Sequence, residues 1–115
     1  DSTMSGKYEV FLGKDQQYYF RLKAANGEVI LSSEGYVNKS GCLNGIASVQ
    51  KNSPEDHNYE RLTAKNDAPY FTLKAANHQV IGRSEMYSSV AARDKGIESV
   101  KKNGTSSTIN ELPVH

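Results

Sequence analysis

The side chains that most often carry chemistry are few in this 115-residue sequence, and they lie far apart. The single cysteine, Cys42, falls on the apolar side of a predicted helix, and no histidine or aspartate stands at a spacing that would activate it. We therefore interpret Cys42 as a buried residue without a catalytic role. The three histidines, His57, His78 and His115, share no ligand spacing with one another or with the cysteine. The sequence therefore predicts no metal site and no cofactor.

Other catalytic signatures are also missing from the sequence. It contains no Gly-rich phosphate loop, no Gly-x-Ser-x-Gly motif and no paired-carboxylate pattern. Asp15, Asp56 and Asp67 fall in predicted loops, where carboxylates are usually solvated. We therefore predict that the protein is not an enzyme. An enzyme without a recognisable site stays as an alternative, because a fold by itself permits many chemistries.

One basic side chain stands within an apolar stripe. On a helical wheel, Arg93 lies between Ile97 and Val100 of the second predicted helix. A charge in such a place needs a partner, or its stem packs while the charged head reaches water. A pair with a nearby carboxylate is therefore one interpretation of Arg93. The other is an anion contact near the start of that helix, where the helix dipole favours negative charge.

A candidate binding surface follows from alternation in two stretches, residues 18–24 and 69–75. Apolar residues alternate there with polar and aromatic ones, so that one set faces a core and the other faces outward. The outward residues that we single out are Tyr19, Arg21, Lys23, Tyr70 and Lys74. Aromatic and basic side chains on an open sheet face can bind single-stranded nucleic acid. The alternative is an ordinary wet sheet face, which the near balance of 14 Lys+Arg against 13 Asp+Glu favours.

These residues belong to a sequence that repeats itself. The string YFRLKAANGEVI at residues 19–30 returns as YFTLKAANHQVI at residues 70–81, an offset of 51 residues. From residue 8 to residue 52, 21 of 45 positions are identical at that offset without a gap. We infer a tandem duplication, with repeat one at residues 7–57 and repeat two at residues 58–112.

Three strands are expected at the start of each repeat. In repeat one they are residues 8–12, 18–24 and 28–34, which are rich in Tyr, Phe, Val and Leu. Asn26 and Gly27 predict a two-residue hairpin in which both residues have positive φ. In repeat two, His78 takes the place of Gly27 and adopts this backbone at some cost.

A helix is expected after the third strand of each repeat. Asn38 and Ser89 are the predicted N-terminal caps. Gly104 predicts a left-handed C-terminal cap for the second helix. Gly45 and Gly96 lie inside the helices, where glycine is unfavourable, and so predict a close approach of each helix to the sheet.

A unit of 51 residues with one helix would be marginal alone, so the two repeats must cover each other. We predict an α+β fold in which a tandem repeat of β-β-β-α-β units forms a single antiparallel sheet. Residues 108–112 form the last predicted strand, and both helices pack on one face, related by a pseudo-twofold axis. Residues 1–115 are expected to form one domain.

The string Leu-Lys-Ala-Ala-Asn, Val-Ile, Ser-Glu and Tyr, followed by Gly-Ile-x-Ser-Val-x-x-Asn, resembles the YegP-like family of small bacterial proteins of unknown function. The resemblance covers both repeats. It implies tandem or dimeric β(3)-α-β units that form one sheet and exchange their C-terminal strands. It implies no reaction, ligand or catalytic residue.

The expected location and partners of the protein follow from its composition. The sequence contains no run of about 18 apolar residues, so we expect no membrane span. Its first 20 residues contain no apolar signal region, so we expect no secretory signal. One cysteine forms no internal disulfide, which fits a reducing, cytoplasmic location. We predict a monomeric, non-enzymatic binding or interaction module with a protein partner. The alternatives are a single-stranded nucleic-acid binder that uses the open sheet face, and an enzyme.

Overall fold

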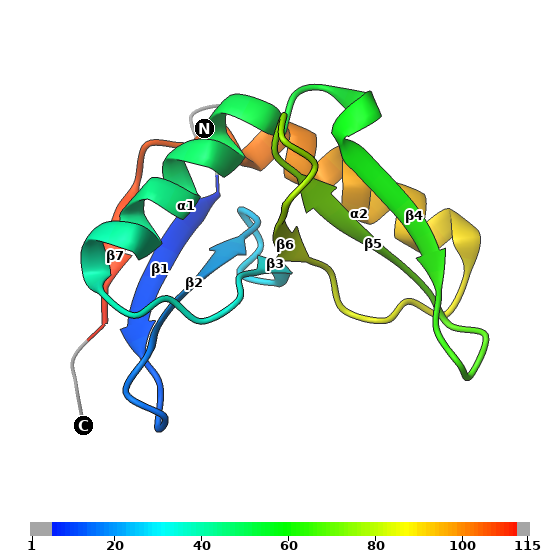
Figure 1. The fold of residues 1–115 in the computed structure, drawn as a ribbon. Helices are drawn as coiled ribbons and strands as arrows, with labels where there is room; N and C mark the ends of the chain where they lie inside the picture. The colour runs from blue at the N-terminus through cyan, green and yellow to red at the C-terminus, as the bar shows by residue number, and fades with distance from the viewer. Residues whose placement is uncertain (1–5, 113–115) are drawn as a thin grey trace.

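The computed structural model describes residues 6–112 of the protein. Its strands form one seven-stranded sheet in the order β4-β5-β6-β3-β2-β1-β7, and both helices cover the same face (Figure 1). The elements are β1 (Lys7–Leu12), β2 (Tyr18–Lys23), β3 (Val29–Ser32), α1 (Lys39–Asn52), the 3-10 helix η1 (Asp56–Asn58), β4 (Tyr59–Thr63), β5 (Pro69–Lys74), β6 (Val80–Arg83), α2 (Val90–Asn103) and β7 (Ile109–Glu111). The predicted α+β fold class is confirmed.

The short strand β7 departs from the predicted antiparallel sheet. It lies parallel to β1, with Tyr8 opposite Ile109 and Val10 opposite Glu111, so the sheet is mixed and the all-antiparallel prediction is wrong here. The cause is the path of the chain after α2. Ser106 Oγ donates a hydrogen bond to the Gly6 carbonyl (2.6 Å), so the chain joins β1 at its beginning and β7 then runs in the same direction.

The core is shared between the repeats. The two halves of the sheet meet where β3 pairs with β6 at Ser32 and Arg83. Helix α1 packs on β2 of its own repeat and on β5 and β6 of the other, while α2 packs on β5, β3 and β2. Buried side chains of both repeats therefore form one cluster, as expected for units too small to cover their own strands.

The C-terminal ends of the two helices meet near the pseudo-twofold axis. Tyr8 of repeat one donates a hydrogen bond to the Gly104 carbonyl (2.6 Å), and Tyr59 of repeat two donates to the Ser53 carbonyl (2.7 Å). Gly104 has φ −65°, so the predicted left-handed cap is wrong. The glycine is needed there for space, because a Cβ at this position would lie 2.6 Å from the Cβ of Ser53.

The hairpin turns also differ from the expected geometry. Gly27 has a positive φ of 87° but Asn26 does not, so the two-residue hairpin prediction is wrong. The Gly27 N–H donates to the Ala24 carbonyl and the Ala24 N–H to the Glu28 carbonyl, a three-residue loop ending in a left-handed residue. His78 adopts φ 70° at the equivalent position of repeat two, as expected.

Both helices begin and pack as predicted. The Asn38 side chain accepts a hydrogen bond from the Gly41 N–H (2.7 Å), and the Ser89 hydroxyl accepts one from the Ala92 N–H (3.0 Å). A Cβ on Gly45 would lie 2.9 Å from the ring of Phe20, which confirms the close approach of helix and sheet. Neither 14-residue helix within residues 6–112 is long and apolar enough to span a bilayer.

Candidate functional site

The face of the sheet opposite the helices, called the bare face below, holds the surface residues singled out from the sequence. In repeat one, Tyr19, Arg21 and Lys23 lie there beside residues of β1, because Phe11 is opposite Tyr19 and Glu9 is opposite Arg21. Because Val10 aligns with Arg61 of repeat two, the sequence alone does not decide which side of β1 faces the core. The alternation of Tyr8 and Val10 with Glu9 and Phe11 was the signal that could have settled it.

A nearly buried carboxylate neutralises the two basic residues of this surface. Glu9 is only 6% exposed, and its Oε1 lies 2.7 Å from Arg21 Nε and 3.3 Å from Lys23 Nζ. Burial acts to raise the pKa of the Glu9 carboxyl, but the hydrogen bonds and charges of Arg21 and Lys23 outweigh it and lower this pKa. The carboxylate therefore stays ionised, and the net charge of the three side chains is about one positive unit.

Beside this ion pair lies an aromatic stack. The rings of Phe11 and Tyr19 are 5.7 Å apart at an interplanar angle of 17°, and the Arg21 guanidinium lies 5.0 Å from the centre of the Phe11 ring. The Tyr19 hydroxyl donates a hydrogen bond to Asp15 (2.5 Å), which raises the pKa of the Tyr19 hydroxyl and lowers that of the Asp15 carboxyl. We call Phe11, Tyr19 and Arg21 the aromatic patch.

Repeat two presents a plainer version of the same face. Tyr70 lies opposite Leu62 rather than opposite an aromatic ring, and Thr72 stands in the place of Arg21. Lys74 pairs with Glu60 (2.9 Å), whose side chain is 47% exposed. The structure thus places all five predicted surface residues on the bare face, but gathers Tyr19, Arg21 and Lys23 in one half and Tyr70 and Lys74 in the other.

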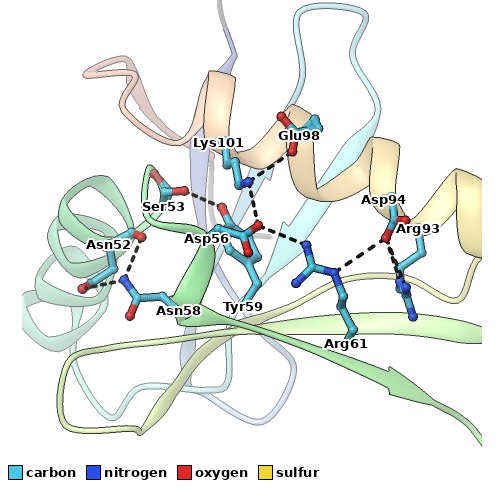
Figure 2. Close-up of polar contacts among 10 residues, drawn as sticks. All are labelled: Asn52, Ser53, Asp56, Asn58, Tyr59, Arg61, Arg93, Asp94, Glu98 and Lys101. Atoms are coloured by element: carbon cyan, nitrogen blue, oxygen red, sulfur yellow. Dashed lines mark hydrogen bonds and ion pairs between the residues drawn. The ribbon is translucent and has the colours of Figure 1, made fainter.

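A second polar cluster lies on the helix side of repeat two, between β4 and α2 (Figure 2). Asp56 Oδ1 accepts hydrogen bonds from Lys101 (2.7 Å) and from Arg61 Nη2 (3.0 Å). Arg61 Nε lies 3.7 Å from Asp94 Oδ1, and Lys101 also contacts Glu98 (3.1 Å). The hydrogen bonds from Lys101, then from Arg61, lower the pKa of the Asp56 carboxyl. We call these residues, together with Arg93, the ion cluster.

Arg93, the candidate anion contact, belongs to this cluster. Its Nη2 and Nε lie 3.1 and 3.2 Å from Asp94 Oδ1, and its side chain is 12% exposed. The carboxylate pair considered from the sequence is therefore present. An additional anion at Arg93 stays a prediction.

The equivalent place in repeat one is apolar. Val10, Cys42 and Leu43 stand where repeat two has Arg61, Arg93 and Asp94. The side chain of Cys42 is buried as predicted, and burial raises the pKa of its thiol to about 11. A thiol of that pKa holds almost no thiolate at neutral pH, so it is a poor nucleophile.

The histidines give little support to a catalytic site. His57 and His78 line one open hollow with Lys51, Lys74 and Glu55, at the end of α1. Within residues 6–112 no three His, Cys, Asp or Glu side chains gather as metal ligands. His115 lies outside the described residues.

These features define a class of protein: a small α+β protein made of two tandem units that share one mixed sheet, one face of which is bare. A family model described as a domain of unknown function, DUF1508, matches the chain twice, at residues 14–60 and 64–111. The chain belongs to this family, in a tandem form.

Two relatives match nearly the whole chain, and neither name states an activity. A UPF0339 protein of Acinetobacter baylyi is 65% identical over 109 residues, which are 95% of this chain and 98% of that protein. The YegP protein of Escherichia coli is 52% identical over 108 residues, 94% of this chain and 98% of that one. The resemblance to YegP-like proteins is therefore confirmed.

Solved structures of two relatives match this fold closely. The solution NMR structure of a UPF0339 protein from Shewanella oneidensis has a TM-score of 0.89 at 60% identity, covering 95% of this chain and 92% of that one. The solution structure of Escherichia coli YegP, titled a protein of unknown function, also has a TM-score of 0.89, at 52% identity, and the match covers 94% of this chain and 93% of that one.

Proposed function

We propose that the protein is a non-enzymatic protein-interaction module that binds its partner through the aromatic patch of the bare face. The observation that carries this proposal is the stack of Phe11 and Tyr19, with Arg21 over it, on a face that neither helix covers. Aromatic and arginine side chains are enriched in the centres of protein interfaces. A platform already ordered by stacking and ion pairing loses little side-chain entropy on binding.

The charges of the patch favour a protein over a nucleic acid. Binding to phosphates gains most of its free energy when basic side chains release counterions. Here Glu9 already neutralises much of the positive charge of Arg21 and Lys23. The patch therefore offers aromatic and apolar area with little net charge, which suits a protein surface better than a phosphate backbone.

The remaining parts of the proposal rest on the site chemistry. Cys42 is buried with a raised pKa, and the polar clusters of residues 6–112 are self-paired, which supports a role without catalysis. The one cysteine supports action in the cytoplasm. A core shared between the repeats supports a monomer.

Affinity capture with matched variants tests the proposal. The wild type and Tyr19→Ala would be immobilised beside Tyr70→Ala, which removes the equivalent tyrosine from repeat two, and exposed to lysate of the source cell with and without nuclease. We expect a defined protein partner that survives nuclease and high salt, is lost with Tyr19→Ala and is kept with Tyr70→Ala. Equal capture by the wild type and both variants would contradict the use of the patch.

A single-stranded nucleic-acid binder is the second candidate, because the patch combines aromatic rings with basic side chains. Its distinguishing result is salt-dependent binding of short oligonucleotides that Tyr19→Ala and Tyr70→Ala both weaken. Glu9→Gln frees Arg21 and Lys23 and should strengthen such binding. Oligonucleotide binding with this pattern would replace the protein partner as the proposed ligand.

A further inference from the structure

The two repeats differ at their outer strands. Strand β1 of repeat one has β2 on one side and β7 on the other. Its equivalent in repeat two is β4, which pairs with β5 and forms the opposite end of the sheet, as Figure 1 shows at the right of the molecule. No strand within residues 6–112 pairs with the outer side of β4. An uncovered edge of this kind presents backbone groups that can pair with another chain.

The occupied edge serves as a template for the uncovered one. The Tyr8 N–H donates to the Thr108 carbonyl (2.9 Å), and the Leu112 N–H donates to the Val10 carbonyl (2.8 Å). The outward backbone groups of β1 are thus those of Tyr8 and Val10, and the equivalent residues of β4 are Tyr59 and Arg61. The Tyr59 N–H already donates to the Asp56 carbonyl of η1, which leaves the Tyr59 carbonyl and the Arg61 backbone for an added strand.

We propose that the outer edge of β4 binds an extended segment of a partner protein as an eighth strand, parallel to β4 and in the register that β7 takes on β1. Such strand addition gains affinity from main-chain hydrogen bonds and selectivity from alternate side chains. The surface is separate from the aromatic patch, so this inference does not depend on the proposed function.

The selectivity of the edge follows from one difference at the start of the helices. In repeat one, Lys39 at the first turn of α1 pairs with Glu111 of β7 (2.5 Å). The equivalent residue of α2 is Val90, which is 55% exposed. A strand on β4 therefore places an apolar side chain against Val90, at the position where β7 carries Glu111.

The same comparison argues against a second copy as the occupant. The strand β7 of another molecule is already paired with its own β1. On β4 its Glu111 would exchange Lys39 for Val90. It would also lie beside Arg61, whose charge Asp56 and Asp94 already neutralise. Antiparallel pairing of two β4 strands about Arg61 would place like charges opposite each other, which is destabilising. Charged side chains such as Glu60 and Arg61 are typical of edges that resist self-association.

A peptide titration tests this inference on the full chain. Two peptides are used, the sequence of residues 105–112 and the same sequence carrying Glu111→Val, and binding is followed by amide NMR of the labelled protein. We expect shifts confined to residues 56–63 and Val90, with the Glu111→Val peptide binding at least about tenfold more tightly than the unchanged peptide. Val90 is the site of the matched variant, since Val90→Lys restores the arrangement of Lys39 and should reverse the preference.

Several results would overturn the inference. They are the absence of any shift at β4 with millimolar peptide, shifts at residues 7–12 instead, which would mean exchange with β7, and a preference that Val90→Lys leaves unchanged. A dimer of the free protein whose contacts map to β4 would assign the edge to a second copy and equally reject the proposed partner.

Discussion

In repeat one the space between β1 and α1 is filled by Val10, Cys42 and Leu43, whereas in repeat two the space between β4 and α2 holds the ion cluster. The two repeats share the same order of three strands and a helix. The difference follows the presence of β7, which borders the first space, whereas no strand within residues 6–112 borders the second. Where a strand excludes water, apolar side chains are stable, and where the edge is open, paired charges remain hydrated.

The carboxylate–lysine pairs of the bare face show the same contrast. The side chain of Glu9 beside β7 is 8% exposed, while that of the equivalent Glu60 on the open edge strand is 47% exposed. A similar carboxylate–lysine pair is thus more sheltered in repeat one than in repeat two. Sequence identity between repeats therefore does not ensure identical electrostatics, because the neighbours of an identical residue differ.

The largest loss of stability is expected when Cys42 of repeat one is replaced by arginine, the residue that repeat two has at this position. Cys42→Arg puts a charge into a fully buried position beside Leu43, where repeat two has Asp94, so no carboxylate is in the equivalent place. We expect a loss of more than about 3 kcal/mol in the free energy of unfolding, because a buried unpaired charge is strongly unfavourable. Urea denaturation followed by circular dichroism measures it.

The matched change in repeat two should be mild. Arg93→Met keeps most of the stem volume and removes the charge, and we expect a change of less than about 1 kcal/mol in either direction. If Arg93→Met lowered the free energy of unfolding as much as Cys42→Arg, the ion cluster would be as tightly packed as the apolar space of repeat one. The proposed difference between the two repeats would then be wrong.

The next largest effect concerns the helix glycines. A Cβ on Gly45 would lie 2.8 Å from Tyr36 Cζ and 2.9 Å from the Phe20 ring, whereas one on Gly96 would lie 2.7 Å from Tyr87 Cζ and 3.2 Å from the Phe71 ring. Overpacking outweighs the better helix propensity of alanine, so each substitution should destabilise by about 1–2 kcal/mol.

Thermal and urea unfolding of Gly45→Ala and Gly96→Ala provide the measurement, with Gly45→Ala expected to melt at the lower temperature of the two. An unchanged or higher melting temperature for either variant would mean that the aromatic rings move aside, and that packing is not the reason for the glycine.

The free energy of unfolding should depend on pH through Cys42 of repeat one. Burial raises the pKa of the Cys42 thiol from 9.0 to about 11, so between these values the unfolded chain loses a proton that the folded chain keeps. The free energy of unfolding therefore falls as pH rises, by about 1 kcal/mol at pH 10 from this group. Repeat two has no thiol at the equivalent position, because Arg93 stands there.

The measurement compares urea midpoints of the wild type and Cys42→Ala at pH 8 and pH 10. Both proteins contain the same seven tyrosines, so the difference between the two slopes isolates the thiol. Parallel slopes would indicate that the thiol is accessible to water in the folded state.

The smallest effect is expected at the pair of Lys39 and Glu111, which anchors β7 to α1. Both side chains are about half exposed, at 44% and 54%. Glu111→Gln should therefore cost less than about 1 kcal/mol, and the cost should shrink at high salt. A loss that does not change with salt would show that Glu111 acts by packing and not by charge.

The sequence was sufficient for those parts of the fold that depend on local or repeated patterns. The 51-residue offset, the caps at Asn38 and Ser89 and the close approach at Gly45 could all be predicted, because each is set by neighbours in sequence or by the repeat itself. The outward side of β2 followed from simple alternation.

Other features depend on contacts between distant residues. The parallel direction of β7 is set by where the end of α2 meets β1, and the role of Gly104 is set by Ser53, 51 residues away. The ion cluster brings η1, β4 and α2 together, and Asp56 looked like an ordinary loop carboxylate in the sequence. Such features depend on which distant residues come into contact in the fold, and a single sequence does not show those contacts.

The meeting of the two helix ends bears on how the protein is made. Tyr8 bonds to the Gly104 carbonyl across 96 positions, and Gly6 to Ser106 across 100. Contacts of such long separation form late and slow the folding reaction. We therefore expect that the core closes only after β7 has been synthesised and has paired with β1. Until then the edge of β1 lacks β7, and at that stage aggregation is the main risk.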